Sequence, residues 1–343
     1  FERWDYDDGG TDNLDTGPET VDLFNPNARV AYTGNYSRGS KTNEATGDTT
    51  AFFLFDTLTL SPKWQASLGL RYDIFETEYF YDLGGADPSV KIEAENKELS
   101  WNAGLVHKPV EHGSIYLGVG TSFNPSAEDL TASTSATSNQ NDLDPEESIT
   151  YELGTKWELM QGRLFTSAAI FRTDKKRART DDPFDVGTSF ETLRGEQRVQ
   201  GIELTAAGQV TKALSLTVGY ALQDSEVVRA DGDDQVREGQ ELARTPRHSI
   251  SSWGRYDFSE KFAAGLGAQY ISERYNSSDP AGREKADGYV VFDMMVSYQI
   301  NPQWSAQING SNLADEEYED QLGGGHFIPG DGRLLTFSTR YSF

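Results

Sequence analysis

The stretch that decides the fold is WQASLGLRYDI, residues 64–74, in which two kinds of side chain alternate strictly. Its even positions are mostly apolar or aromatic, and its odd positions are small, polar or charged. Successive side chains of a β-strand point to opposite faces, so this stretch has one oily face and one wet face. The same alternation returns in 149–159, 214–223 and 290–300, and no stretch shows comparable helical spacing. The sequence therefore predicts an all-β protein.

Strand length distinguishes a soluble sandwich from a membrane barrel. The alternation predicts strands near 50–60, 64–78, 97–108, 113–122, 147–159, 163–175, 197–209, 214–226, 246–258, 261–275, 288–300, 304–314 and 332–343. Most of them exceed the ~5–6 residues that are usual in globular proteins. They also reach the ~9–11 residues that a tilted strand needs to cross the core of a bilayer.

The connections between these strands alternate between short and long. The short ones lie near 61–63, 109–112, 160–162, 210–213, 259–260 and 301–303, and the long ones near 7–48, 79–96, 123–146, 176–196, 227–245, 276–287 and 315–331. Short turns at one end and long loops at the other are typical of outer-membrane barrels. We therefore predict a transmembrane antiparallel β-barrel that spans the bacterial outer membrane, with a soluble all-β protein as the alternative.

The amino-acid composition excludes several classes of function. The chain has 343 residues, no Cys and a formal net charge of -25, which resides in the long loops. The absence of Cys excludes disulfides and thiolate metal sites, and the negative charge argues against nucleic-acid binding. No nucleophile elbow, phosphate loop or cluster of metal ligands is present. The segment 231–234 could hold Ca²⁺, but it lacks EF-hand spacing. We expect neither an enzyme nor a resident cofactor or metal.

The last strand ends in Phe343, with Tyr341 two residues before it on the same face. This ending resembles the C-terminal signal by which the barrel-assembly machinery recognises outer-membrane barrels. The alternative is an ordinary last strand that happens to end in Phe.

Several motifs occur in the order in which one receptor family carries them. They are WQASLGLRYD (64–73), TSFNPS (121–126), DPEE (144–147) followed by YELGTKW (151–157), GEQRVQGIE (195–203), TPRH (245–248), NLAD (312–315) and GDGR (330–333). Together they resemble the TonB-dependent ferric-siderophore receptors of the catecholate type.

The resemblance implies a barrel of about 22 strands around an N-terminal plug. Residues 1–343 would then be the C-terminal portion of that barrel, some 13–14 strands, with strands from about 50 to 343 and a long extracellular loop at 7–48. Residues 1–6 would be the stub of a fourteenth strand. The plug, the TonB-binding segment and the first strands would not be in this chain.

The resemblance also implies a function. Such a receptor binds a ferric siderophore at its extracellular loops and imports it with energy supplied by TonB through the missing N-terminal part. Lipopolysaccharide and other outer-membrane lipid would surround the barrel. Two alternatives stay open: a receptor of the same family for a vitamin or glycan, and a passive fourteen-stranded channel.

A ferric catecholate is anionic and flat-faced, so its site should combine Arg or Lys with aromatic rings. Strand ends and loops that offer such residues give the candidates Tyr79, Tyr81, Lys176, Arg177, Arg179, Arg274, Tyr275, His326 and Phe327. Each has a plainer interpretation. The tyrosines fit the aromatic girdle at the membrane interface, the Lys-Arg cluster fits contacts to lipopolysaccharide phosphate, and the Gly-rich segment around 326 fits a flexible loop.

Overall fold

The computed structural model describes residues 2–13, 36–82, 90–125, 144–184, 191–323 and 326–343. Fourteen strands form one antiparallel sheet in which every strand pairs with its neighbour along the chain. They are β1 (Glu2–Asn13), β2 (Tyr36–Ser61), β3 (Trp64–Asp82), β4 (Val90–Val110), β5 (Gly113–Asn124), β6 (Glu146–Leu159), β7 (Leu164–Asp181), β8 (Glu191–Gln209), β9 (Leu214–Arg229), β10 (His248–Asp257), β11 (Phe262–Ile271), β14 (Tyr289–Gln299), β15 (Trp304–Ser311) and β18 (Leu334–Tyr341). The predicted all-β meander is confirmed.

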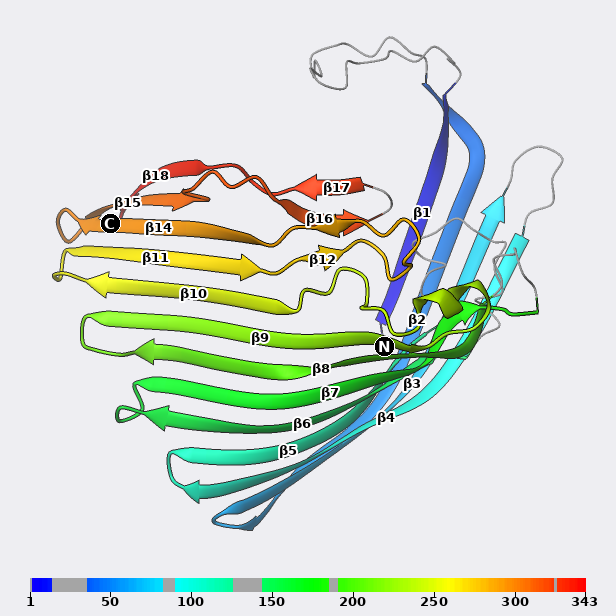
Figure 1. Cartoon of the computed structure of the whole chain (residues 1–343), viewed down its shortest axis with the longest axis horizontal. Coiled ribbons are helices and arrows are strands. Elements are labelled where there is room, and N and C mark those ends of the chain that lie inside the picture. The colour runs from blue at the N-terminus through cyan, green and yellow to red at the C-terminus, as the bar shows by residue number, and fades with distance from the viewer. Residues whose placement is uncertain (1, 14–35, 83–89, 126–143, 185–190, 324–325) are drawn as a thin grey trace.

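The sheet curves, so that β1 and β2 stand steeply across the view of Figure 1 while β9 to β11 run along it. The short turns gather at one end of the strands, and the long connections lie at the other, as predicted from the sequence (Figure 1). The two edges of the sheet are β1 and β18, and they do not pair with each other within the described residues.

One face of the sheet carries a band of exposed apolar side chains. Register places them in rows across neighbouring strands, as in the row Leu153, Ile170 and Ile202. Each of these three is at least 40 % exposed. The opposite face is polar; there the Tyr116 hydroxyl donates a hydrogen bond to Glu152. A sheet with an oily outer face and a wet inner face is the wall of a membrane barrel.

Aromatic side chains line the short-turn edge. Tyr256 and Phe258 meet edge to face with ring centroids 4.7 Å apart. The predicted assembly signal lies at the same edge, where Tyr341 contacts both Trp304, at 5.2 Å between centroids, and Phe343, at 5.1 Å. Amphipathic rings favour the boundary between lipid and water, so this edge marks one membrane surface.

From β1 to β9 the strands extend further toward the long-loop end than the sequence predicted, whereas β10, β11, β14, β15 and β18 stop short of the predicted bounds there. β1 runs to Asn13 and β2 already begins at Tyr36, so the expected first strand at 50 starts too late and the expected loop 7–48 is too long. Strands beyond the membrane have water on both faces. They need no apolar face, and alternation of hydrophobicity cannot find their ends.

Short elements also occur at the long-loop end, most of them inside segments that were expected to be irregular loops. They are the 3₁₀ helix η3 (Gly232–Arg237), the hairpin of β12 (Arg274–Tyr275) with β13 (Lys285–Ala286), and the hairpin of β16 (Glu319–Gly323) with β17 (His326–Pro329). The pair Arg274–Tyr275 instead lies in the last part of the strand expected at 261–275, which ends at Ile271. No helix in the described part of the chain is long and apolar enough to cross a membrane. These elements are too short and polar to show a periodicity in the sequence.

Candidate functional site

The predicted basic cluster lies at the long-loop end of β7 and is engaged by carboxylates of β6. Lys175 Nζ lies 2.6 Å from Glu146 Oε2, and Arg177 Nη1 lies 3.0 Å from Glu147 Oε1. Arg179 Nη2 donates a hydrogen bond of 3.5 Å to the carbonyl of Pro125. The cluster therefore ties β7 to the start of β6 and to the connection that follows β5.

Glu146 is the centre of this arrangement, with only 6 % of its surface exposed. Besides Lys175, its carboxylate accepts the backbone N–H of Arg179 at 3.0 Å and Asn124 Nδ2 at 3.3 Å. The bulge between Lys176 and Ala178, with Arg177 at φ 52°, turns that N–H toward it. Burial by itself would raise the pKa of Glu146, but the hydrogen bonds and the ammonium charge outweigh burial and hold this pKa below its ordinary value.

A pH dependence follows from the lowered pKa of Glu146. A carboxylate with a depressed folded-state pKa contributes stability above its unfolded pKa and loses that contribution as the pH falls through the folded value. Below the ordinary value of 4.5, the bulge of β7 should therefore open progressively. Hydrogen exchange of 177–181, corrected for intrinsic rates, should rise on acidification, and Glu146→Gln should show the raised exchange already at pH 7. Glu147→Gln is the control, because its partner Arg177 is exposed. Equal protection in both variants would contradict this role of Glu146.

Not all members of the predicted site face the same way. Lys176 is exposed and shares a face with the apolar band, since it follows Ile170, Arg172 and Asp174 at strand spacing. Tyr79 is 2 % exposed and has the parity of Arg71 and Asp73, on the inner face. Tyr81 lies in β3, but its side chain is outside the described part. The structure thus separates Lys176 from the inner-face candidates.

A second group of predicted residues lies on the β12–β13 hairpin. Arg274 is 6 % exposed. Its Nη2 donates hydrogen bonds to the carbonyls of Glu319 and Asp320, and its guanidinium lies 5.6 Å from the centroid of the Tyr289 ring. Arg274 therefore fastens the β16–β17 hairpin to the wall.

The ring of Tyr275 stacks against the guanidinium group of an arginine. The guanidinium of Arg283 lies 3.3 Å from the Tyr275 centroid, and Arg283 Nη1 donates to Gln240 Oε1 at 2.7 Å. This stack joins the β9–β10 connection to the β12–β13 hairpin. An Arg on an aromatic face is the combination expected for a flat anionic ligand, although here the arginine is already held by protein groups.

Asn312 positions the last long connection, a role that the NLAD motif signalled but that the set of candidate residues lacked. Its side chain is 2 % exposed. Nδ2 donates to the carbonyls of Glu316, at 2.8 Å, and Asp331, at 2.9 Å, while Oδ1 accepts the N–H of Glu316 at 2.8 Å. Its own N–H donates to Asp293 Oδ1 at 3.0 Å. One buried amide thus fixes both ends of the connection to the wall.

The last connection borders an acidic cavity of about 760 Å³. Phe327 is 56 % exposed at its rim, and the side chain of His326 is outside the described part. The charged lining residues are Lys285, Asp287, Asp315, Glu316, Glu317 and Glu319. This excess of carboxylates does not favour an anion at Phe327. No group of three or more metal-ligating side chains occurs among the described residues.

Comparison with known proteins decides the family. The chain matches the family described as "TonB dependent receptor-like, beta-barrel" over residues 2–313. It belongs to this family. The sheet is therefore part of an outer-membrane receptor barrel, and the family is one of receptors and transporters rather than enzymes.

Three relatives of TonB-dependent receptor type illustrate the match. The chain is 33 % identical to the probable TonB-dependent receptor BfrD of Bordetella pertussis, over 93 % of this chain and 44 % of that one. The crystal structure of the ferric-catecholate import receptor Fiu from Escherichia coli K12, in its closed form, superposes with a TM-score of 0.85 at 27 % identity, over 99 % of this chain and 50 % of that one. The siderophore receptor PiuA from Acinetobacter baumannii gives 0.82 at 28 % identity, over 90 % and 45 %.

The chain thus spans about half the length of the TonB-dependent receptors it matches. The matched part contains the wall and the long connections described above. The predicted family and fold class are confirmed, and the predicted ligand residues stay predictions.

Proposed function

We propose that this chain forms the C-terminal wall of a receptor that captures a ferric siderophore and imports it with energy from TonB. The observation that carries the proposal is its similarity to the ferric-catecholate import receptor Fiu, at a TM-score of 0.85 over nearly the whole chain. A siderophore complex is too bulky and too scarce to enter by passive diffusion. A wall with elaborated extracellular connections suits capture before transport.

The basic residues at the long-loop end of β7 support capture of an anion. Arg177 and Arg179 lie at the extracellular end of the wall, in a chain whose net charge is -25. Cations in such surroundings concentrate an anionic ligand locally. Tyr275 under Arg283 supplies an aromatic and cationic pair on the connection between β11 and β14. The acidic cavity beside Phe327 does not suit the anion, so we place capture nearer β7 and β12.

The test uses the full-length receptor in detergent. Iron(III) complexes of a catecholate and of a hydroxamate are titrated, and the catecholate complex is expected to bind with nanomolar affinity. If neither complex binds at that level, the siderophore assignment fails. Complexes of other metals would then be the next ligands to test. The chain is also 29 % identical, over 86 % of its length, to the metal-pseudopaline receptor CntO of Pseudomonas aeruginosa.

The double variant Arg177→Gln/Arg179→Gln should weaken binding of the anionic complex by about tenfold, since each charge-assisted contact is worth more than a neutral one. Arg163→Gln is the matched control, because Arg163 lies at the short turn on the opposite end of β7 and donates to the carbonyl of Met160. Unchanged affinity in the double variant would remove the β7 end from the binding site without touching the family assignment.

A further inference from the structure

The outer wall carries a hollow just where its apolar band ends on the extracellular side. The outward rows of the band include Tyr151 and Ile170, which are 47 % and 54 % exposed. One step further toward the loops, Ile149 pairs with Asp174, and Asp174 pairs with Arg198. Lipid therefore gives way to charge within one row of the wall.

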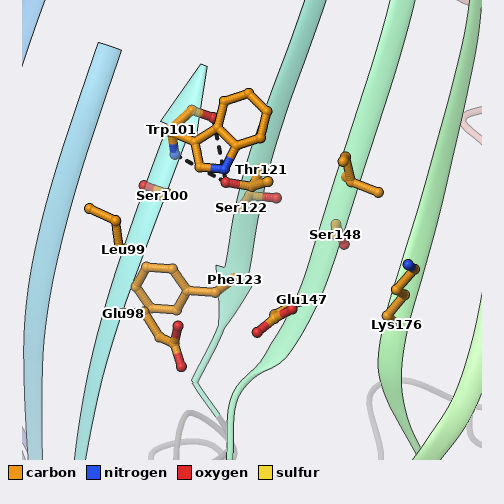
Figure 2. A pocket seen from close by; sticks show the side chains of 11 residues that line it. Glu98, Leu99, Ser100, Trp101, Thr121, Ser122, Phe123, Glu147, Ser148 and Lys176 are labelled. Carbon is orange, nitrogen blue, oxygen red and sulfur yellow. Dashed lines mark hydrogen bonds between the residues drawn. The ribbon is translucent and has the colours of Figure 1, made fainter. Parts of the chain in front are cut away.

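The first half of the hollow has both apolar and polar lining residues and arises where two strands part. The β4–β5 ladder reaches Asn102 and Gly120 and goes no further among the described residues. Beyond it, the Thr121 hydroxyl takes the place of the ladder: it accepts the N–H of Trp101 at 3.0 Å and donates to its carbonyl at 3.4 Å. The space that opens, about 230 Å³, is lined by Leu99, Trp101 and Phe123, which Figure 2 shows, and by Ile149. Glu98, Glu147, Lys176 and four Ser and Thr side chains form the rest of its lining.

The second half is basic and shares Ile149 and Lys176 with the first. It has a volume of about 510 Å³ and is lined by Arg172, Lys176 and Arg198 above Ile149 and Tyr151. Figure 2 shows Lys176 on the strand next to the one that bears Glu147 and Ser148. Register places these three cations on the outward face, since Tyr151 pairs with Arg172.

The positive charge of these three cations is only partly neutralised by nearby carboxylates. Two guanidinium groups share the single carboxylate of Asp174, Arg172 Nε at 2.7 Å and Arg198 Nε at 2.8 Å. Of the other carboxylates that line the hollow, Glu147 has Arg177 as its partner at 3.0 Å and Glu196 has Arg229 at 3.5 Å, while Glu98 lies in the half beside Phe123. Lys176 has no ion pair among the described residues. The hollow therefore stays positive on a protein whose net charge is -25.

We propose that this hollow binds a phosphate-bearing lipid of the outer leaflet. Its phosphate would lie between Arg172, Arg198 and Lys176: the two guanidinium groups supply the N–H donors that Asp174 leaves free, and Lys176 supplies an ammonium group. An acyl chain of the same molecule would occupy the gap beside Phe123. The apolar side chains next to the three cations, and their height on the wall, match an amphiphile whose charged head sits at the membrane surface. The proposal rests on the membrane placement of the wall and is independent of the siderophore assignment.

The test measures binding of fluorescent, diphosphorylated lipid A to the full-length receptor in detergent micelles. Arg172→Gln/Arg198→Gln should weaken binding by roughly tenfold or more, whereas Asp174→Asn, which removes the competing carboxylate, should strengthen it a few-fold. Opposite shifts from neighbouring substitutions on one face are not expected from general destabilisation. Equal affinities for the unaltered protein and both variants would overturn the proposal.

Three comparisons complete the experiment. Arg255→Gln is the matched control, because Arg255 bonds Asp257 two residues on at 3.0 Å, the same arrangement as Arg172 and Asp174, but near the short-turn end; it should leave lipid binding unchanged. Lipid A without phosphate should bind the unaltered receptor at least several-fold more weakly, and equal binding would refute the phosphate contact. Millimolar inorganic phosphate should not displace the lipid, and displacement would identify a simple anion site instead.

Discussion

Replacing Gly201 by Ala should cost the barrel about 2–3 kcal/mol of unfolding free energy, within the range of overpacked sites. A Cβ on Gly201 would lie 2.0 Å from the carbonyl oxygen of Leu222, a backbone atom of the next strand, and 3.1 Å from the Phe171 ring. Backbone in the middle of a ladder cannot move aside without breaking its own hydrogen bonds. The urea midpoint of the full-length receptor in micelles, and the folded fraction on refolding, should both fall.

Gly219 is the matched control for this substitution. It lies on β9, the strand that pairs with the one bearing Gly201, and a Cβ built on it has no heavy atom within 4 Å. Gly219→Ala should therefore stay within about 0.5 kcal/mol of the unaltered protein. If both variants unfold at the same urea concentration, the close approach at Gly201 does not limit stability.

Asn312→Ala should release the connection between β15 and β18 while the wall stays folded. The substitution leaves two carbonyls and one N–H without the side-chain partners that hold them, at about 1–3 kcal/mol for each group that stays buried. Asn312 also has φ 47°, a region that asparagine tolerates better than alanine. Hydrogen exchange of 312–323 and 326–333 should rise by at least tenfold, with little change in β6 to β9.

Two further variants distinguish the effect of the Asn312 hydrogen bonds from the effect of its backbone conformation. Asn312→Gly keeps the backbone conformation and loses the hydrogen bonds, so it should release the connection almost as fully as alanine does. Asn309→Ala removes an asparagine that accepts one side-chain bond, from Gln307 at 2.8 Å, and should have a small effect. Full protection in Asn312→Gly would show that conformation, and not the buried amide, holds the connection.

The strands that cross the membrane could be predicted from the sequence because the lipid requires one apolar face. Residues 64–74 alternate strictly because one face must be apolar across the whole bilayer, and the same demand acts on 149–159 and 290–300. The order of strands, the turn at each short connection and the position of Tyr341 at the membrane edge all follow from it. Beyond the membrane this demand stops, which is why the first 14 residues of β2, up to Thr49, looked like loop.

The candidate site was less predictable because it depends on which way a side chain turns and on what already occupies it. Sequence correctly located the cations on the end of β7, but it could not show that Lys175 and Arg177 are held by carboxylates of β6. It could not show that Arg274 fastens a hairpin, because its partners are backbone carbonyls 45 residues away. Lys176 lies on the outer face of the wall and not on the inner face, which the alternation within 170–176 could have indicated.

The parting of β4 from β5 divides the rim of the wall. On one side of the seam the extensions of β2, β3 and β4 are laddered to one another, and on the other side β5 to β9 form a second continuous group. Across the seam, the described residues of the two groups are joined at Trp101 by the Thr121 hydroxyl. Past Asn102 and Gly120 the described part of the rim is therefore two separate hydrogen-bonded sheets, whereas the same strands form one sheet nearer the short turns.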